Sequence, residues 1–241
     1  SKSRGLGDVY KRQIKFCKNI LIKLNMDSDK ARATSEILVE ADMMGHSTHG
    51  VRLLPNYVSD IEKGIMKVNG NYKIISEKKS NVRIDGKLLP GIWLTQEGLK
   101  IGIEKAKDFG VSTVTIGNSH HNGALAAYLK NIVDEGFIAI IKSSVPSNST
   151  VAPFGGTEPL FTPNPMAIGF PTNNLPVIID ISASITTNNM IAEKIANEQK
   201  FDFNCLLTSE GIPSNDPLEV RDKSGTVLPV GGMGYLSLIH I

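Results

Sequence analysis

Segments with helical and strand-like patterns alternate through the middle of this 241-residue chain. Residues 95–109 have the apolar spacing of an amphipathic helix and precede Gly110, and glycine commonly ends helices. Residues 111–116 are rich in β-branched side chains and predict a strand, and a further helix and strand are expected over 123–135 and 137–141. A strand–helix–strand order is typical of layered folds, so the sequence predicts the α/β class.

The N-terminal part of the chain predicts helices. Apolar residues recur at helical spacing over 16–24 and 28–44, and a third helix is expected over 53–63, ending at Gly64. The expected strands outside the alternating middle are short and lie at 72–75, 81–84, 166–170 and 177–181.

Both ends of the chain look foreign to the rest. Residues 8–13 and 236–241 read like translations of a sequencing adapter on its two strands, so we expect residues 1–13 and 236–241 to be adapter-derived tails. What remains is an N-terminal helical segment over 14–70 and an α/β region over 71–235.

Charge and composition narrow the possible partners. The chain carries 26 Lys and Arg against 24 Asp and Glu, but residues 1–13 hold four of the basic and one of the acidic residues. Without the tails 22 basic and 23 acidic residues remain, which gives no indication of a nucleic-acid partner. We expect no membrane partner, because no apolar run approaches the roughly 18 residues of a membrane span. The two cysteines form no CxxC pair, and no signal-peptide pattern precedes them, so we expect a reduced, cytoplasmic protein.

The phosphate-binding fingerprint of the Rossmann fold is missing from the sequence. No GxGxxG motif follows any of the predicted strands. A nicotinamide enzyme built on this chain would therefore need another way to hold the cofactor's pyrophosphate.

Apart from His240 in the suspected tail, the histidines lie in two short clusters, each flanked by glycine. The first runs over 45–50 and contains His46 and His49; the second runs over 118–123 and contains His120 and His121. The second cluster is expected between a strand and a helix, where α/β folds usually bind ligands, and a histidine there can exchange a proton near neutral pH. Such histidines can equally cap turns or pack in the interior, and spacing alone does not decide between these roles.

A metal site is the competing interpretation of the same clusters. His46 and His49 are three residues apart and could share a helical face, with His120 or His121 completing a site for a metal-dependent hydrolase. Adjacent histidines seldom both reach one metal, and the chain has no HExxH motif, so we expect no metal.

Two further segments offer polar groups for a ligand. The loop 143–150 is rich in hydroxyls that could bind phosphates or ribose, although a solvated loop explains the same composition. Asp180, at the end of an expected strand, could bind a ribose or cap a turn.

Several segments, in this order, together resemble the malate/lactate dehydrogenase 2 family, which includes ureidoglycolate, sulfolactate and diketogulonate oxidoreductases and a cyclic-imine reductase. The matching segments are Ala41-Asp42 through His49-Gly50, Asn118-Ser119-His120-His121, Ala152-Pro153-Phe154-Gly155-Gly156 with Glu158-Pro159, and Asn164-Pro165. The resemblance spans about residues 14–235. It implies an oxidoreductase that transfers a hydride between NAD or NADP and a small 2-hydroxyacid, 2-oxoacid or cyclic imine. It also implies a non-Rossmann nicotinamide-binding α/β fold, with 71–235 as the cofactor-binding region, and a homodimer at full length.

The resemblance also assigns roles to individual residues. His121 matches the family's catalytic acid/base, which would accept the hydroxyl proton in oxidation and return it in reduction. Thr48 and His49 match its substrate site, and Arg52 is a candidate for the substrate carboxylate. The cofactor contacts match the loop serine, which is Ser147 or Ser144 depending on the direction of counting, and a strand end formed by Asp180, Ile181 and Ser182.

Two departures from the family pattern carry expectations of their own. The family commonly has arginine where this chain has Leu53, with Arg52 one place earlier. A cofactor-site lysine is expected at the position of Leu236, inside the suspected tail. Family members also continue beyond this point, so we expect a truncated chain with an incomplete cofactor site and low activity.

Overall fold

A computed structural model describes residues 2–145 and 147–232 of the chain. The chain divides into two compact units, unit 1 over residues 1–137 and unit 2 over residues 138–241. The expected tail at 236–241 and the position of Leu236 lie outside the described residues. The boundary falls directly after the last helix of unit 1, and each unit has strands of its own.

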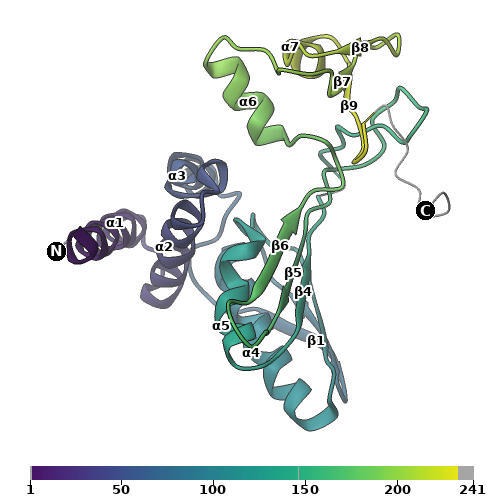
Figure 1. The fold of residues 1–241 in the computed structure, drawn as a ribbon. Helices are drawn as coiled ribbons and strands as arrows, with labels where there is room; N and C mark the ends of the chain where they lie inside the picture. The colour runs from purple at the N-terminus through teal and green to yellow at the C-terminus, as the bar shows by residue number, and fades with distance from the viewer. Residues whose placement is uncertain (1, 146, 233–241) are drawn as a thin grey trace. The chain divides into compact units, whose positions relative to one another are not determined.

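Unit 1 begins with three helices, as the apolar spacing predicted (Figure 1). They are α1 (Lys2–Lys23), α2 (Ser28–Met43) and α3 (Leu54–Glu62), and two short 3-10 turns, η1 (Ser47–His49) and η2 (Val51–Leu53), connect the last two. Helix α1 begins earlier than the pattern indicated, so the helix also contains most of the suspected N-terminal tail.

A three-stranded sheet forms the second part of unit 1. Strands β1 (Lys73–Lys78) and β2 (Asn81–Asp85) pair antiparallel, and β3 (Thr113–Gly117) pairs parallel with β2. Helix α4 (Gly91–Phe109) connects β2 to β3 and ends at Gly110, whose φ of +78° is the left-handed conformation that glycine adopts most easily. This β–α–β unit is the part of the expected α/β alternation that the structure contains.

A buried lysine helps to join α2 to α4. Lys30 is 2% exposed, and its Nζ lies 2.9 Å from Asp27 Oδ2 and 4.1 Å above the Trp93 ring. Ala33, Leu89 and Leu94 form the apolar cluster around that ring. The aliphatic stem of Lys30 therefore packs like a core residue while the ammonium is held by a carboxylate and an aromatic face.

The segment expected to be one helix over 123–135 is shorter and divided. It consists of the 3-10 turn η3 (Leu125–Tyr128) followed by α5 (Leu129–Asp134). Gly123 has a φ of +70°, which is outside the range of a right-handed helix. The helical part therefore begins after the glycine, and its apolar residues Leu125, Leu129 and Ile132 are buried.

Unit 2 contains two small sheets. Strands β4 (Ala139–Lys142), β5 (Met166–Phe170) and β6 (Val177–Ile181) pair antiparallel in that order. The second sheet has the order β8 (Pro213–Ser214), β7 (Leu206–Leu207), β9 (Thr226–Val227), and the short helices α6 (Asn188–Ala196) and α7 (Leu218–Asp222) belong to the same unit. Strand β3 belongs to the sheet of unit 1 and β4 to a sheet of unit 2, so these two strands do not pair as a strand–helix–strand unit would. The described chain is a mixed α/β fold of helices and small sheets.

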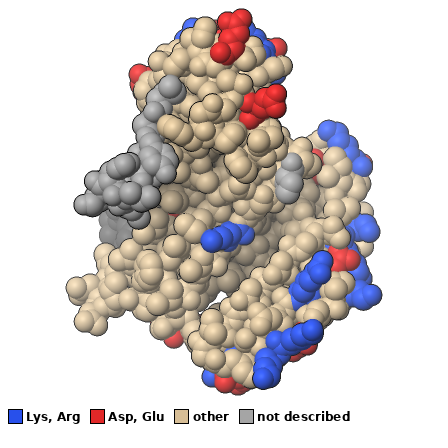
Figure 2. Space-filling model, turned by 90° about the vertical axis from the view of Figure 1, so that its right-hand side faces the viewer, with Lys and Arg blue, Asp and Glu red and all other residues tan. Residues whose placement is uncertain are grey.

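The surface carries mixed charge. Figure 2 shows acidic side chains among the basic ones, with wide uncharged areas on the same face. Among the described residues, no helix is long and apolar enough to cross a membrane.

Candidate functional site

The second histidine cluster lies on the loop that leaves β3, where the strand–helix pattern placed it. The loop turns at Asn118, whose φ is +50°. It then passes over the first residue of α4, Gly91, so closely that a Cβ there would lie 2.0 Å from the carbonyl oxygen of His120 and 2.5 Å from that of His121. The absent side chain of Gly91 thus lets the loop pack against the start of the helix.

His121 makes three contacts within unit 1. Its Nδ1 lies 2.8 Å from Tyr57 Oη on α3, and the backbone N–H of Gly123 donates to the same nitrogen over 3.2 Å. The His49 ring stacks on the His121 ring with centroids 5.8 Å apart and planes 21° apart. These contacts bring the two histidine clusters together, and both hydrogen bonds are made at Nδ1.

The surroundings of His121 favour its neutral form. Its pKa is lowered from 6.5 to about 4, mainly by burial and to a smaller extent by the neighbouring His49 and His120, while Asp60 acts in the opposite direction. Burial raises the pKa of Tyr57 above its ordinary value. At neutral pH the pair is therefore an uncharged imidazole and a protonated phenol.

His120 has a different partner. Its Nε2 lies 3.0 Å from Asp60 Oδ2, one turn beyond Tyr57 on α3, and the edge of its ring faces Tyr57 with centroids 5.4 Å apart. Burial lowers the pKa of His120 although Asp60 acts in the opposite direction. Asp60 and His120 therefore form a pair that packs against Tyr57.

Asp42 holds the first cluster in place. Its Oδ2 accepts the backbone N–H of Val51 over 3.1 Å, and a Cβ on Gly50 would lie 1.8 Å from its Oδ1. Thr48 Oγ1 lies 3.0 Å from His49 Nδ1. The carboxylate thus fixes the turn from which Thr48 and His49 extend.

The structure shows where Leu53 and Arg52 lie. Leu53, at the position where the family pattern has arginine, is 7% exposed and belongs to the core. Arg52 lies in an exposed position one residue earlier. An apolar side chain therefore occupies the place that the resemblance associates with a cation.

No observation supports the metal-dependent hydrolase. Among residues 2–145 and 147–232, no group of three or more His, Cys, Asp or Glu is arranged to hold a metal ion. The rings of His49 and His121 lie nearly parallel, face against face. Two histidine ligands would instead direct a nitrogen of each ring at one point.

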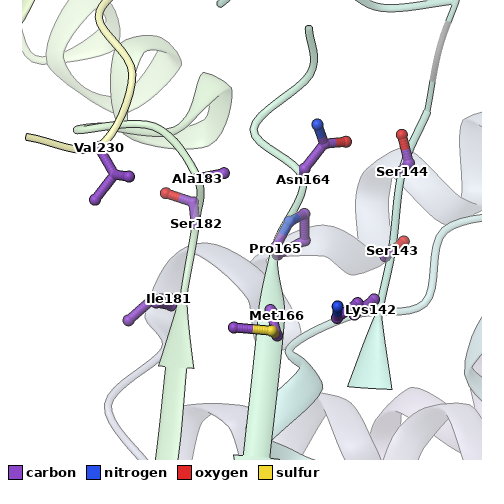
Figure 3. A pocket seen from close by; sticks show the side chains of 10 residues that line it. All are labelled: Lys142, Ser143, Ser144, Asn164, Pro165, Met166, Ile181, Ser182, Ala183 and Val230. Carbon is purple, nitrogen blue, oxygen red and sulfur yellow. The ribbon is translucent and has the colours of Figure 1, made fainter. Parts of the chain in front are cut away.

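Unit 2 has a cavity of about 580 Å³ at one end of the β4–β5–β6 sheet (Figure 3). Lys142, Met166 and Ile181 stand opposite one another on the three strands. The loops that follow or precede these strands supply Ser143, Ser144, Asn164, Pro165, Ser182 and Ala183, and the segment after β9 supplies Val230. The cavity thus combines hydroxyls and one ammonium with an apolar wall.

Asn164 has an unusual backbone conformation at this cavity. It lies between two prolines with a φ of +41°, and its Oδ1 accepts a hydrogen bond of 2.7 Å from Thr162 Oγ1. Residues held in the left-handed region often occur at ligand sites, because the surrounding structure must support the strain.

The expected cofactor residues are only partly grouped. Ser144, Ile181 and Ser182 line the cavity, whereas Ser147 and Asp180 are not among its lining residues. Asp180 lies beside Ile181 in β6 and pairs with Ala167, so its side chain leaves the opposite face of the sheet.

The sequence reasoning missed Tyr57, Asp60, Lys142 and Asn164. Helical spacing offered one signal, since Leu54, Tyr57 and Asp60 follow at intervals of three and share one side of α3.

Comparisons with known proteins identify the family of the chain. The family model for malate/L-lactate dehydrogenase matches residues 10–239. A malate/(S)-sulfolactate dehydrogenase of Methanothermus fervidus is 33% identical over 90% of this chain and 63% of its own length. A (2R)-3-sulfolactate dehydrogenase (NADP(+)) of Chromohalobacter salexigens is 30% identical over 87% of this chain and 62% of its own length.

A crystal structure of malate dehydrogenase from Entamoeba histolytica has a TM-score of 0.88 and 29% identity, covering 93% of this chain and 63% of that one. The chain thus spans somewhat less than two thirds of the length of these relatives. The sequence match and the similarity of fold both indicate one family, and the chain belongs to the malate/L-lactate dehydrogenase family.

Proposed function

We propose that the protein is an NAD- or NADP-dependent oxidoreductase that interconverts a small 2-hydroxyacid and the corresponding 2-oxoacid. The observation that carries the proposal is His121, a neutral, buried imidazole whose Nδ1 is engaged by Tyr57 and Gly123. A neutral imidazole with an unprotonated Nε2 can accept the hydroxyl proton in oxidation, and the imidazolium formed in this way can return it in reduction. Family membership supports the same reaction class, since relatives named above are malate and sulfolactate dehydrogenases.

The cavity of unit 2 is the proposed cofactor site, in a fold without the Rossmann fingerprint. A nicotinamide dinucleotide bound there would supply or accept the hydride. The lining of the cavity fits the chemistry of such a dinucleotide. The Ser144 and Ser182 hydroxyls and the Lys142 ammonium could bind phosphate or ribose, and Met166 and Ile181 could pack against an aromatic ring. Ser147 and Asp180 remain proposed contacts from the resemblance. The printed name of one relative includes NADP, and both cofactors are to be tested.

The substrate site is proposed at the first histidine cluster. Thr48 and His49 supply a hydroxyl and an imidazole beside His121, and Arg52 is the proposed cation for the substrate carboxylate. His121 would hold the proton that the substrate oxygen gains in reduction and loses in oxidation. We further propose a homodimer at full length and a reduced, cytoplasmic location, which the two buried free cysteines support.

Binding and turnover should be measured separately. We expect the fluorescence of NADH or NADPH to change on titration with the protein, and Ser144→Ala to weaken binding more than Ser147→Ala. Oxidation of the reduced cofactor should follow the addition of oxaloacetate or 3-sulfopyruvate. His121→Ala should abolish turnover and leave cofactor binding unchanged. A His121→Ala variant with normal turnover, or a wild-type protein that binds neither cofactor, would contradict the proposal.

A further inference from the structure

The hydrogen bonds around His121 determine which of its two nitrogens carries the proton. A neutral imidazole has one N–H donor and one acceptor nitrogen. The N–H of Gly123 points at Nδ1 over 3.2 Å, so Nδ1 is the acceptor and Nε2 bears the hydrogen. We propose that Tyr57 is a positioning residue that holds His121 in this Nε2–H tautomer by donating a hydrogen bond from its hydroxyl to Nδ1.

Tyr57 is suited to donate this hydrogen bond. Its side chain is 3% exposed, and burial together with the nearby Asp60 carboxylate favours the protonated phenol. Its Oη lies 2.8 Å from Nδ1, and edge contacts with the rings of His120 and His121 fix the orientation of the phenol. A protonated hydroxyl at this distance from an acceptor nitrogen is a donor.

The nearby carboxylate does not compete for His121. In many sites a carboxylate bound to Nδ1 holds a histidine in the Nδ1–H tautomer, ready to accept a proton at Nε2. Here Asp60 binds Nε2 of His120 instead, and a phenol and a backbone amide occupy Nδ1 of His121. These partners therefore select the opposite tautomer from a histidine–carboxylate pair.

The tautomer has a consequence for ligand recognition, and this step rests on the proposed function. An Nε2–H group offers a hydrogen bond to an oxygen that accepts, as a carbonyl oxygen does. The resting protein is therefore prepared for the 2-oxoacid. The 2-hydroxyacid requires an unprotonated Nε2, so the ring must release the Nε2 proton to solvent and take up a proton at Nδ1, where Tyr57 Oη can accept a hydrogen bond and the Gly123 amide cannot.

The tautomer can be measured without cofactor or substrate. In protein with 15N-labelled histidine, long-range 15N–1H correlation spectra distinguish protonated from unprotonated ring nitrogens, and His121→Gln identifies the His121 signals by their loss. At neutral pH we expect wild-type His121 to show a protonated Nε2 and an unprotonated Nδ1. In Tyr57→Phe the Nδ1 signal should shift, and the excess of the Nε2–H tautomer should fall, because only the Gly123 amide still donates to Nδ1. The matched control Tyr72→Phe removes the hydroxyl of a ring that packs against Trp93, elsewhere in unit 1, and should leave the His121 signals unchanged.

Two results would overturn the inference: a protonated Nδ1 in the wild-type protein, or Tyr57→Phe signals identical to those of the wild type. If the protein turns over, Tyr57→Phe should lower kcat/KM about tenfold, the effect of one ordinary hydrogen bond. The loss should be equal in both directions, because the overall equilibrium is unchanged. A protein with the expected tautomer that neither binds nor oxidises NADH would refute the proposed function and leave this inference standing.

Discussion

The depressed pKa of His121 predicts that unit 1 loses stability in mild acid. The ring has a pKa of about 4 in the folded protein and 6.5 as the ordinary value, so the unfolded chain binds more protons between these two pH values. Stability from this residue is therefore fully present above about pH 6.5 and declines as the pH falls toward 4. The gap corresponds to about 3 kcal/mol, because each tenfold change in proton affinity is worth about 1.4 kcal/mol.

Removal of the imidazole isolates this contribution. His121→Gln and His121→Asn lack the titrating group, so each should lose about 3 kcal/mol less than the wild type between about pH 7 and pH 4. Both variants leave the Tyr57 hydroxyl without its partner, which lowers stability at every pH without changing the slope. Agreement between the two variants excludes a packing effect particular to one of them.

Urea unfolding followed by tryptophan fluorescence is the suitable assay. The chain has one tryptophan, Trp93, and it lies in the core of unit 1, so its emission follows the unfolding of that unit. The midpoint and slope at each pH give the free energy of unfolding. If the variants lost as much stability in acid as the wild type, burial of a neutral His121 would not be the source of the acid sensitivity, and the reasoning would fail.

Three further predictions concern packing. Gly91→Ala should displace the loop that carries His120, since the new Cβ would lie 2.0 Å from the His120 carbonyl oxygen, and should lower both stability and any turnover. The control Gly102→Ala, on the same helix, places its Cβ 3.4 Å from the nearest neighbour and should lower neither. Urea unfolding and activity assays compare the two variants. Lys30→Met keeps the buried stem but removes the ammonium over Trp93, so we expect a loss of about 1–2 kcal/mol in urea unfolding. Iodoacetamide should alkylate neither Cys17 nor Cys205 until urea unfolds the chain, because both thiols are buried and burial raises their pKa values.

Local patterns predicted the longer elements. The helices α2 and α4 have apolar spacing over many residues, and β5 and β6 combine β-branched side chains with turn signals at their ends. The strands β7, β8 and β9 have two residues each, which is too short for any periodicity to register.

Sheet partners lay beyond the reach of local pattern. Strand β4 directly follows the helical segment after β3, yet it pairs with β5, across the whole hydroxyl-rich loop. The choice depends on contacts distant in sequence, which propensity does not encode. The sequence predicted the order of helices and strands in the middle of the chain. It did not predict that the chain divides into two units after residue 137.

The candidate site was predictable to a similar extent. The cluster of His120 and His121 follows a strand and precedes a helical segment, and this position marked the cluster as a candidate, while the family resemblance singled out His121. Its partner Tyr57 is 64 residues away on α3 and reads as an ordinary core position of an amphipathic helix. The same holds for Lys142 at the cavity, which looks like a solvent-facing residue at the end of a short strand.

Two glycines near the histidines matter for the space that they leave: Gly50 flanks the first cluster in the sequence, and Gly91 packs against the second. Gly50 has a φ of −92°, which other residues also adopt, and Gly91 begins a right-handed helix, so backbone conformation requires neither glycine. The lack of space requires both, because a Cβ on Gly50 would lie 1.8 Å from Asp42 Oδ1 and a Cβ on Gly91 would lie 2.0 Å from the His120 carbonyl oxygen. Each glycine thus allows a second segment to approach the backbone that carries a histidine. A glycine next to a candidate catalytic residue can therefore mark close packing around the site, and its replacement by alanine moves the histidine without altering its chemistry.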